Sequence, residues 1–141
     1  MPSAVLDSAT LISAFLKPGG VADLVLQQAY ERAFELFLAE EILAETRRVL
    51  LETDRIRQRY AYPDESVHRF IRGLHGIAQM TGPLPSLAGI VRDPNDDMIV
   101  ACALAAKAQY IVTRDNDLLS LRTYETITMI TPEAFMSILR H

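Results

Sequence analysis

The sequence predicts an α/β fold, a three-layer α/β/α sandwich with a mostly parallel central sheet. Short apolar runs, the pattern of strands buried on both faces, alternate along the chain with longer segments of helical periodicity. The chain has 141 residues, half of them hydrophobic, which suits one compact core. We therefore expect residues 1–141 to form a single domain.

Two strand-and-helix units are expected in the first half of the chain. Both strands are short apolar runs, and a Pro-Gly-Gly turn at 18–20 separates the first two helices. Val21, Leu24 and Val25 then recur at helical spacing. The expected elements are strands at 4–6 and 34–38 and helices at 10–16, from 21 onward and at 40–51.

The second half should begin with a longer helix and end with a capped one. Pro63 precedes a segment of strong helical periodicity, and a proline-rich turn at 81–85 follows it. Thr131 is the expected N-cap of the last helix, with Pro132 at its first position. The expected elements are helices at 64–80, 97–107 and 132–140 and strands at 110–112 and 126–130.

Composition excludes several classes of protein. The 14 basic and 18 acidic residues give a net charge of −4, which argues against binding nucleic acid by bulk charge alone. Cys102 is the single cysteine and His68, His75 and His141 form no ligand pattern, so neither a disulfide framework nor a zinc site is expected. No apolar run reaches the roughly 20 residues that span a bilayer, so we expect a soluble, cytoplasmic protein with no membrane partner.

Acidic residues fall where predicted strands end. Asp7 follows the first strand, Asp115 follows the strand at 110–112, and Asp97 opens a helix. In open α/β sheets, ligands bind beyond the carboxyl ends of the strands, where the strand order reverses. We therefore expect Asp7, Asp97 and Asp115 to converge on one cleft. Helix capping is the alternative role for Asp97, and of the two adjacent acids Asp96 is the better candidate for capping alone.

Glu45 lies on an apolar helix face together with Ile42 and Val49. A carboxylate that is buried there needs a positive partner, because an unpaired buried charge costs several kcal/mol. Three alternatives satisfy it. Glu45 forms an ion pair with Arg47 or Arg48, it is protonated, or it faces the same cleft as the other acids and binds a cation.

Several carboxylates in one cleft repel one another unless a cation binds among them. A set of oxygen ligands suits Mg²⁺, with Mn²⁺ as the alternative, and either ion can activate water and offset charge on a phosphoryl oxygen. In the segment after the strand at 110–112, Asp117 adds an acid, and Thr113 adds a hydroxyl that can orient a carboxylate or a water. The alternative for this segment is an ordinary Asp-rich turn.

Five segments, each weak alone, form a specific pattern in their order and spacing. They are VLDSATLISA at 5–14, EILAE at 41–45, RDPNDD at 92–97, ACALA at 101–105 and VTRDNDLL at 112–119. This pattern resembles that of PIN-domain ribonucleases, close to the VapC-like toxins of bacterial toxin–antitoxin pairs. The resemblance covers nearly the whole chain, and it implies a parallel sheet between layers of helices, in agreement with the fold predicted above.

The resemblance implies Mg²⁺- or Mn²⁺-dependent endonucleolytic cleavage of RNA. By this resemblance Asp7, Glu45, Asp97 and Asp115 match the metal-binding acids of the family, and Asp117 is an auxiliary acid. In the expected mechanism Asp7, Asp97 and Asp115 hold the cation, and Glu45 completes its coordination or positions the attacking water. The resemblance also implies a cognate antitoxin protein as a partner, and a homodimer.

One position departs from the family pattern. The family usually has Asp-Thr-Asn after its first strand, where this chain has Asp7-Ser8-Ala9. Ser8 keeps a hydroxyl and is an auxiliary candidate, whereas Ala9 lacks the amide that would help to fix the hydrogen bonds of the site. The alternative function is therefore a catalytically weak or silent module of the same fold that binds RNA or a protein partner.

Other chemistries fit less well. Ser8, Ser13 or Cys102 as a covalent nucleophile would lack a histidine nearby in the sequence. A phosphatase of this fold class needs a second aspartate where this chain has Ala9, and a receiver domain needs a lysine after a late strand.

Half of the basic residues, seven arginines, lie between positions 47 and 72. Guanidinium groups suit phosphate because they donate two hydrogen bonds at once, and Tyr60 or Tyr62 can stack on an unpaired base. The alternative is a solvated helix face paired with nearby acids. The candidates for RNA contact are Arg47, Arg48, Arg55, Arg57 and Arg59.

Overall fold

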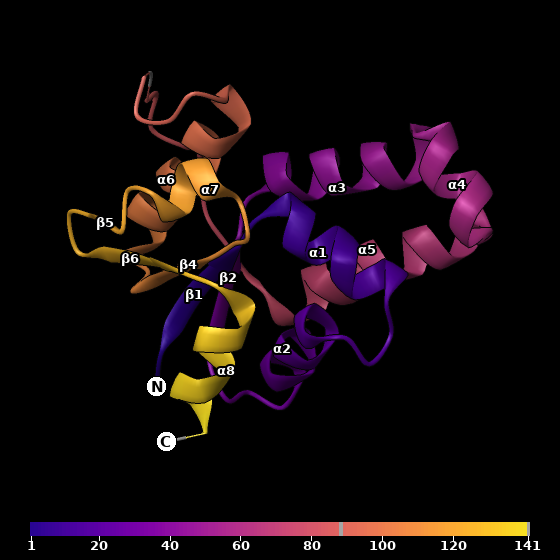
Figure 1. Ribbon diagram of the computed structural model, residues 1–141, viewed down its shortest axis with the longest axis horizontal. Coiled ribbons are helices and arrows are strands. Elements are labelled where there is room, and N and C mark those ends of the chain that lie inside the picture. Colours follow the sequence, from indigo (N-terminus) through magenta and orange to yellow (C-terminus); the bar gives the residue numbers. More distant parts are fainter. Residues whose placement is uncertain (88, 141) are drawn as a thin grey trace.

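The structure, a computed structural model, describes residues 1–87 and 89–140, so His141 lies outside the described residues. The strands are β1 (Ser3–Leu6), β2 (Glu35–Leu38), β3 (Gln79–Met80), β4 (Tyr110–Val112), β5 (Thr123–Tyr124) and β6 (Ile127–Ile130). Within the described ranges they form one six-stranded sheet with the order β3-β2-β1-β4-β6-β5 (Figure 1). Neighbouring strands are parallel except for β5 and β6, which are antiparallel.

Helices cover both faces of this sheet, which confirms the predicted three-layer α/β/α sandwich. They are α1 (Ser8–Leu16), α2 (Val21–Tyr30), α3 (Glu40–Glu52), α4 (Asp54–Tyr60), α5 (Asp64–Ile77), α6 (Pro94–Ala106), α7 (Asn116–Leu119) and α8 (Pro132–Leu139). The first helix, α1, packs against α2 and α3 on one side of the sheet, and α6 packs on β1, β2 and β4 on the other (Figure 1). None of the described helices is by itself long and apolar enough to cross a membrane. Only α1 and α2 together meet such a test, and they are bent by 99° to each other.

The strands are buried on both faces, as their continuous apolar runs predicted. Ala4, Val5 and Leu6 of β1 have no exposed surface, and neither do Ile111 and Val112 of β4. Because successive side chains of a strand point to opposite faces, such burial requires a layer of helices on each side.

The strand order reverses between β1 and β4. The chain passes from β1 to β2 and β3 on one side of the sheet, and then returns to place β4 on the other side of β1. The crevice at such a switch point, beyond the carboxyl ends of the strands, is the usual ligand site of an open α/β sheet. The register places Leu6, the last residue of β1, opposite Val112, the last residue of β4.

Two predicted helix boundaries differ from the structure by three residues. The helix predicted at 64–80 ends at Ile77, and Gln79 and Met80 pair with β2 as the edge strand β3. This pairing is long-range, so helical periodicity cannot reveal it. The helix predicted to begin at Asp97 begins three residues earlier, because Asp93 caps it and Pro94 occupies its first position. At the other end of the chain, Thr131 caps α8 as predicted.

The short helix α4 was not predicted, and Arg57 holds it in place. The Arg57 guanidinium donates hydrogen bonds to the carbonyl oxygens of Leu51 and Tyr62, at 3.1 and 3.0 Å, and pairs with Asp64. It also lies over the Tyr62 ring, 5.2 Å from the centroid. These contacts join α3, α4 and the start of α5. Arg57 therefore has a structural role, and its predicted RNA contact stays a prediction.

Replacing Arg57 by alanine is expected to lower the free energy of unfolding by about 1–3 kcal/mol, because two carbonyl groups lose their donors. Arg59→Ala is the matched control, since Arg59 is exposed on the same helix and its loss should cost less than about 0.5 kcal/mol. Urea unfolding of both variants measures the difference. Equal losses in the two variants would contradict this role of Arg57.

Candidate metal centre

Asp7 and Thr113 are adjacent because each follows the end of a paired strand. Since Leu6 lies opposite Val112, the next residue of each strand emerges at the same edge of the sheet. The Thr113 hydroxyl donates a hydrogen bond to Asp7 Oδ2, and the Thr10 backbone N–H donates to Asp7 Oδ1 at 2.9 Å. Asp7 is only 4% exposed and Thr113 is fully buried. The Asp7 carboxylate is therefore held in one orientation.

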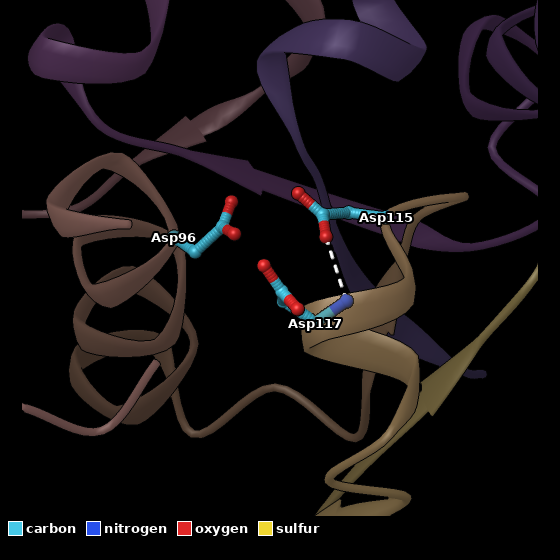
Figure 2. A group of neighbouring side chains, drawn as sticks. All are labelled: Asp96, Asp115 and Asp117. Carbon is cyan, nitrogen blue, oxygen red and sulfur yellow. Dashed lines mark hydrogen bonds between the residues drawn. The ribbon is translucent and has the colours of Figure 1, made fainter. Parts of the chain in front are cut away.

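Thr113 also connects Asp7 to Asp115. Its hydroxyl oxygen accepts a hydrogen bond from the Asp115 backbone N–H at 3.0 Å while its proton is donated to Asp7. Asp115 caps α7, because its Oδ1 accepts from the Asp117 backbone N–H at 2.8 Å (Figure 2). The Asp-rich segment is thus a capped turn, and the cap fixes where the Asp115 carboxylate points.

Asp96 brings a third carboxylate to this place from α6. In Figure 2 the side chains of Asp96, Asp115 and Asp117 point toward one another. One carboxylate oxygen of each residue lies within 4.8 Å of those of the other two. Asp96 is 7% exposed, and its buried Oδ2 has no hydrogen-bond partner among residues 1–87 and 89–140. Leaving a buried carboxylate oxygen without a partner is costly, and a cation bound among the three carboxylates would offset that cost.

The expectation that Asp97 joins this cluster while Asp96 caps the helix is wrong. Asp93 is the cap, since its Oδ1 accepts from the Asn95 backbone N–H at 2.9 Å. Neighbouring residues of a helix are rotated by about 100°, so Asp96 and Asp97 face different sides. Asp97 accepts hydrogen bonds from the backbone N–H groups of Val91, at 2.7 Å, and Gly89, at 3.3 Å. Asp97 therefore anchors the loop that enters α6.

A cleft of about 200 Å³ lies over the cluster. Asp7, Ser8 and Ala9 line it from the end of β1 and the start of α1, and Asp96 and Asp115 line it from the other side. Asp93 and Asn95 also line the cleft, and neither was among the predicted site residues. No lysine, arginine or histidine is among the described side chains that line the cleft. It is therefore an acidic cleft whose carboxylates could bind a cation.

Glu45 forms the predicted ion pair with Arg48 and also lines this cleft from α3, while its binding of a cation stays a prediction. Arg48 donates two hydrogen bonds to it, from Nη2 to Oε1 at 2.8 Å and from Nε to Oε2 at 3.3 Å. The Arg48 side chain is 54% exposed and that of Glu45 is 21% exposed. Exposed ion pairs contribute little free energy, so this pairing leaves Glu45 free to take another partner in the cleft.

Burial and mutual repulsion change the acidity of the cluster. The pKa of Asp96 is raised to about 7, first by burial and then by the carboxyl group of Asp115, with smaller effects of Asp93 and Asp7. Burial also raises the pKa of Asp7, although the hydrogen bonds from Thr10 and Thr113 oppose this effect. Without a cation, the cluster thus retains protons at a pH where isolated aspartates are ionised.

The metal-free protein is expected to lose stability as the pH rises from about 4 to about 7. Asp7 and Asp96 have pKa values above the ordinary 3.8, so in this interval the folded state binds more protons than the unfolded state. Their stabilising contribution is complete below the unfolded pKa and is lost as the pH rises through the folded pKa. Thermal unfolding of wild type and Asp96→Asn in chelator measures this loss as the difference between the two proteins. A wild-type midpoint that rises relative to the variant across this interval would contradict the assignment.

The donors of the cluster fit a hard divalent cation. All are carboxylate oxygens, the ligands that Mg²⁺ and Mn²⁺ prefer, and Asp96, whose Oδ2 is orphaned, supplies one of them. Cys102, the single thiol in the sequence, is buried elsewhere with its pKa raised to about 12, chiefly by burial.

An open, mostly parallel sheet with a cluster of acids beyond its switch point defines a class of proteins that bind a cation or a phosphorylated ligand at that edge. The family model of the PIN domain matches residues 3–117, and the chain belongs to the PIN-domain family. The PIN domain is generally a nuclease fold, typically metal-dependent, and the matched range contains every acid described above. No curated protein matches the chain.

The structure therefore brings together most of the residues predicted for the site, with one exchange. The cleft is lined by Asp7, Ser8, Glu45 and Asp115. The Thr113 hydroxyl donates a hydrogen bond to Asp7, and the Asp117 backbone N–H donates one to Asp115. The acid that α6 contributes to the cleft is Asp96 and not the predicted Asp97. The signal that would have found Asp96 is the Asp-Pro pair at 93–94, which fixes the start of α6 and so the direction of each acid in its first turn.

The predicted RNA-contacting arginines separate into different environments. Arg48 pairs with Glu45 at the edge of the cleft, and Arg57 is committed to α4. Arg47 is exposed on α3. Arg55 and Arg59 line a second cavity that adjoins the cleft.

Proposed function

We propose that this protein is a Mg²⁺-dependent endoribonuclease in which Mn²⁺ can replace Mg²⁺. The observation that carries the proposal is the buried, unpartnered Oδ2 of Asp96 in a group of three carboxylates at the switch point of a PIN domain. Such a group is unfavourable when it is empty of positive charge and favourable when a divalent cation binds.

Asp96, Asp115 and Asp117 would hold the cation, with Asp7 beside them at the end of β1. When bound, this cation makes water a better nucleophile and offsets charge on the phosphoryl oxygens. Thr113 orients Asp7 and, through its backbone contact, Asp115. Glu45 lies across the cleft, on α3, where it can accept the proton of the attacking water once a substrate phosphate has taken Arg48 from it.

The biological role that we propose is that of a toxin in a toxin–antitoxin pair. It is supported by the order and spacing of the five segments that resemble such toxins. The partners would be the RNA substrate, a cognate antitoxin protein and a second copy of the chain in a homodimer. Growth arrest on expression of the wild type, relieved by Asp96→Asn, would support this role, and normal growth with active nuclease in the cell would contradict it.

Ala9 favours a second candidate function, a PIN-fold module that binds without cutting. Ala9 lines the acidic cleft at the position where the family usually has asparagine. Its side chain cannot hydrogen-bond, so the cleft wall lacks one polar contact. Metal binding without cleavage by the wild type, with cleavage gained in Ala9→Asn, would support this second function.

The experiment that tests the main proposal is cleavage of a mixed single-stranded RNA pool by purified protein. It compares Mg²⁺, Mn²⁺ and chelator, with wild type and Asp96→Asn. We expect cleavage with either metal, none in chelator, and a rate lower by roughly a hundredfold to a thousandfold in the variant. Cleavage that persists in chelator, or that keeps the wild-type rate in a folded Asp96→Asn protein, would overturn the proposal.

A further inference from the structure

A second cavity, of about 390 Å³, lies beside the acidic cleft. It is bordered by α1, α3 and α4, and it shares two lining residues, Ala9 and Ile12, with the cleft. The two hollows are therefore neighbouring parts of one groove. A polymer whose phosphate lies at the acidic cleft would have its adjacent unit at this second cavity.

The floor of the cavity is apolar. Ile12 and Leu16 come from α1, Val49 from α3 and Ile56 from α4. All four are half-buried, so part of each side chain faces the cavity and not the core. A cavity of this size with an apolar floor and a few polar groups at its edge is typical of a small-molecule or nucleotide site.

The rim of the cavity is basic and aromatic. Lys17, Arg55 and Arg59 are exposed there, and no ion pair with a carboxylate is found for them within residues 1–87 and 89–140. Tyr60 also lines the cavity, and the Arg59 guanidinium lies 5.5 Å from the centroid of its ring. Positive charge next to an aromatic ring is the combination that binds unpaired nucleotides. The groove thus has an acidic end that suits a cation and a basic end that suits phosphate.

We propose that this second cavity binds one unpaired nucleotide of a single-stranded RNA, next to the phosphate at the acidic cleft. The base lies on the apolar floor beside Tyr60, and the flanking phosphates meet Lys17, Arg55 and Arg59. This inference rests on the proposed ribonuclease function, which brings RNA to the cleft. It makes the substrate a single-stranded segment, because a base within a duplex is stacked and cannot enter a cavity without leaving its pair.

The test measures how much the bases themselves contribute to binding. The probes are fluorescein-labelled oligomers of adenylate, cytidylate and uridylate, a base-free ribose-phosphate oligomer and an RNA duplex, all of the same length. Fluorescence anisotropy with Ca²⁺ in place of Mg²⁺ gives their dissociation constants. For the wild type, at least one base-bearing single strand is expected to bind roughly tenfold more tightly than the base-free strand and the duplex.

Ser13→Phe is the variant that fills the cavity. Ser13 lines it from α1 and is only half-buried, and its hydroxyl makes no hydrogen bond to another of the described residues, so the exchange removes no such bond. The preference for bases is expected to fall to about twofold or less in this variant, a loss of most of the stacking contribution. Arg59→Ala, at an exposed position, is the second variant, and it should weaken binding of every strand and reduce the preference. Arg69→Ala, exposed on α5 outside the cavity, removes the same charge and should keep the preference.

Three results would overturn the inference. They are a wild type without a preference for bases, a folded Ser13→Phe protein that keeps the full preference, and equal losses in Arg59→Ala and Arg69→Ala. The RNA-pool assay separates this inference from the proposed function. If the protein cuts RNA with metal but shows no base preference, the ribonuclease function stands and the nucleotide-binding role of the cavity is rejected. If the protein shows a base preference that Ser13→Phe removes but cuts no RNA, the binding role stands and the ribonuclease function is rejected.

Discussion

Asp96→Asn is expected to reduce metal-dependent RNA cleavage by roughly a hundredfold to a thousandfold, the size of loss that follows removal of one group stabilising a transition state. The same change should stabilise the metal-free protein above pH 7, because it removes a carboxylate whose pKa is raised to about 7 by burial and by Asp115. Thermal unfolding with and without Mg²⁺ measures this second effect. The variant should have the higher midpoint in chelator and gain less from Mg²⁺ than the wild type.

Asp97→Asn is the matched control for this prediction. The two residues are adjacent aspartates and are similarly buried, at 7% and 6% exposed. Asp97 accepts hydrogen bonds from Val91 and Gly89, so its replacement should cost about 1 kcal/mol of stability and leave metal affinity nearly unchanged. Loss of metal binding in Asp97→Asn with retention in Asp96→Asn would reverse the assignment of the two acids.

Thr113→Val is expected to lower metal affinity and cleavage by roughly 10- to 100-fold, as is typical when the partner of a metal ligand is removed. Valine has nearly the same shape as threonine, but it can neither donate to Asp7 nor accept from the Asp115 backbone. The two carboxylates would then lose the group that sets their relative position. Metal affinity measured by calorimetric titration, together with the cleavage rate, gives the size of the effect.

Thr46→Val controls for the loss of a buried hydroxyl. Thr46 is fully buried, and its hydroxyl donates to the Ile42 carbonyl oxygen at 2.8 Å within α3. Both threonine variants should lose about 1 kcal/mol of stability. Only Thr113→Val should lose metal affinity, so similar affinities in the two variants would show that Thr113 does not position the acids.

The fold was predictable because its signals are local. Buried strands such as 4–6 and 110–112 are continuous apolar runs, and Thr131 caps the last helix within three residues of sequence. The exceptions depend on distant partners. The edge strand β3 exists because Gln79 and Met80 meet Phe37 and Leu38, which no periodicity within 64–80 can show.

The acids of the candidate site that follow strands were predictable, but the choice between two adjacent acids of a helix was not. Asp7 and Asp115 are fixed by the strands that precede them. Asp96 and Asp97 differ only in direction, and a shift of the helix start by one residue would exchange them. The Asp93 cap and Pro94 decide this direction, and a boundary error of three residues was enough to select the wrong acid.

The different roles of the arginines of α4 were also not predictable from the sequence. Arg55 and Arg59 are four residues apart and lie on one face of this short helix, toward the second cavity. Arg57, two residues from each, lies on another face and contacts Leu51 and Tyr62. Because no helix was predicted between 52 and 63, the three could not be told apart from the sequence.

The central claim is that Asp96, with Asp115, Asp117 and Asp7, forms a divalent cation site. Its most direct test is a crystal structure of the wild-type protein grown with Mn²⁺, with anomalous scattering recorded near the manganese edge. We predict an anomalous peak among the carboxylates of Asp96, Asp115 and Asp117, absent from crystals of Asp96→Asn. A peak at Asp97, or no peak at the cluster with manganese present in the crystal, would contradict the account.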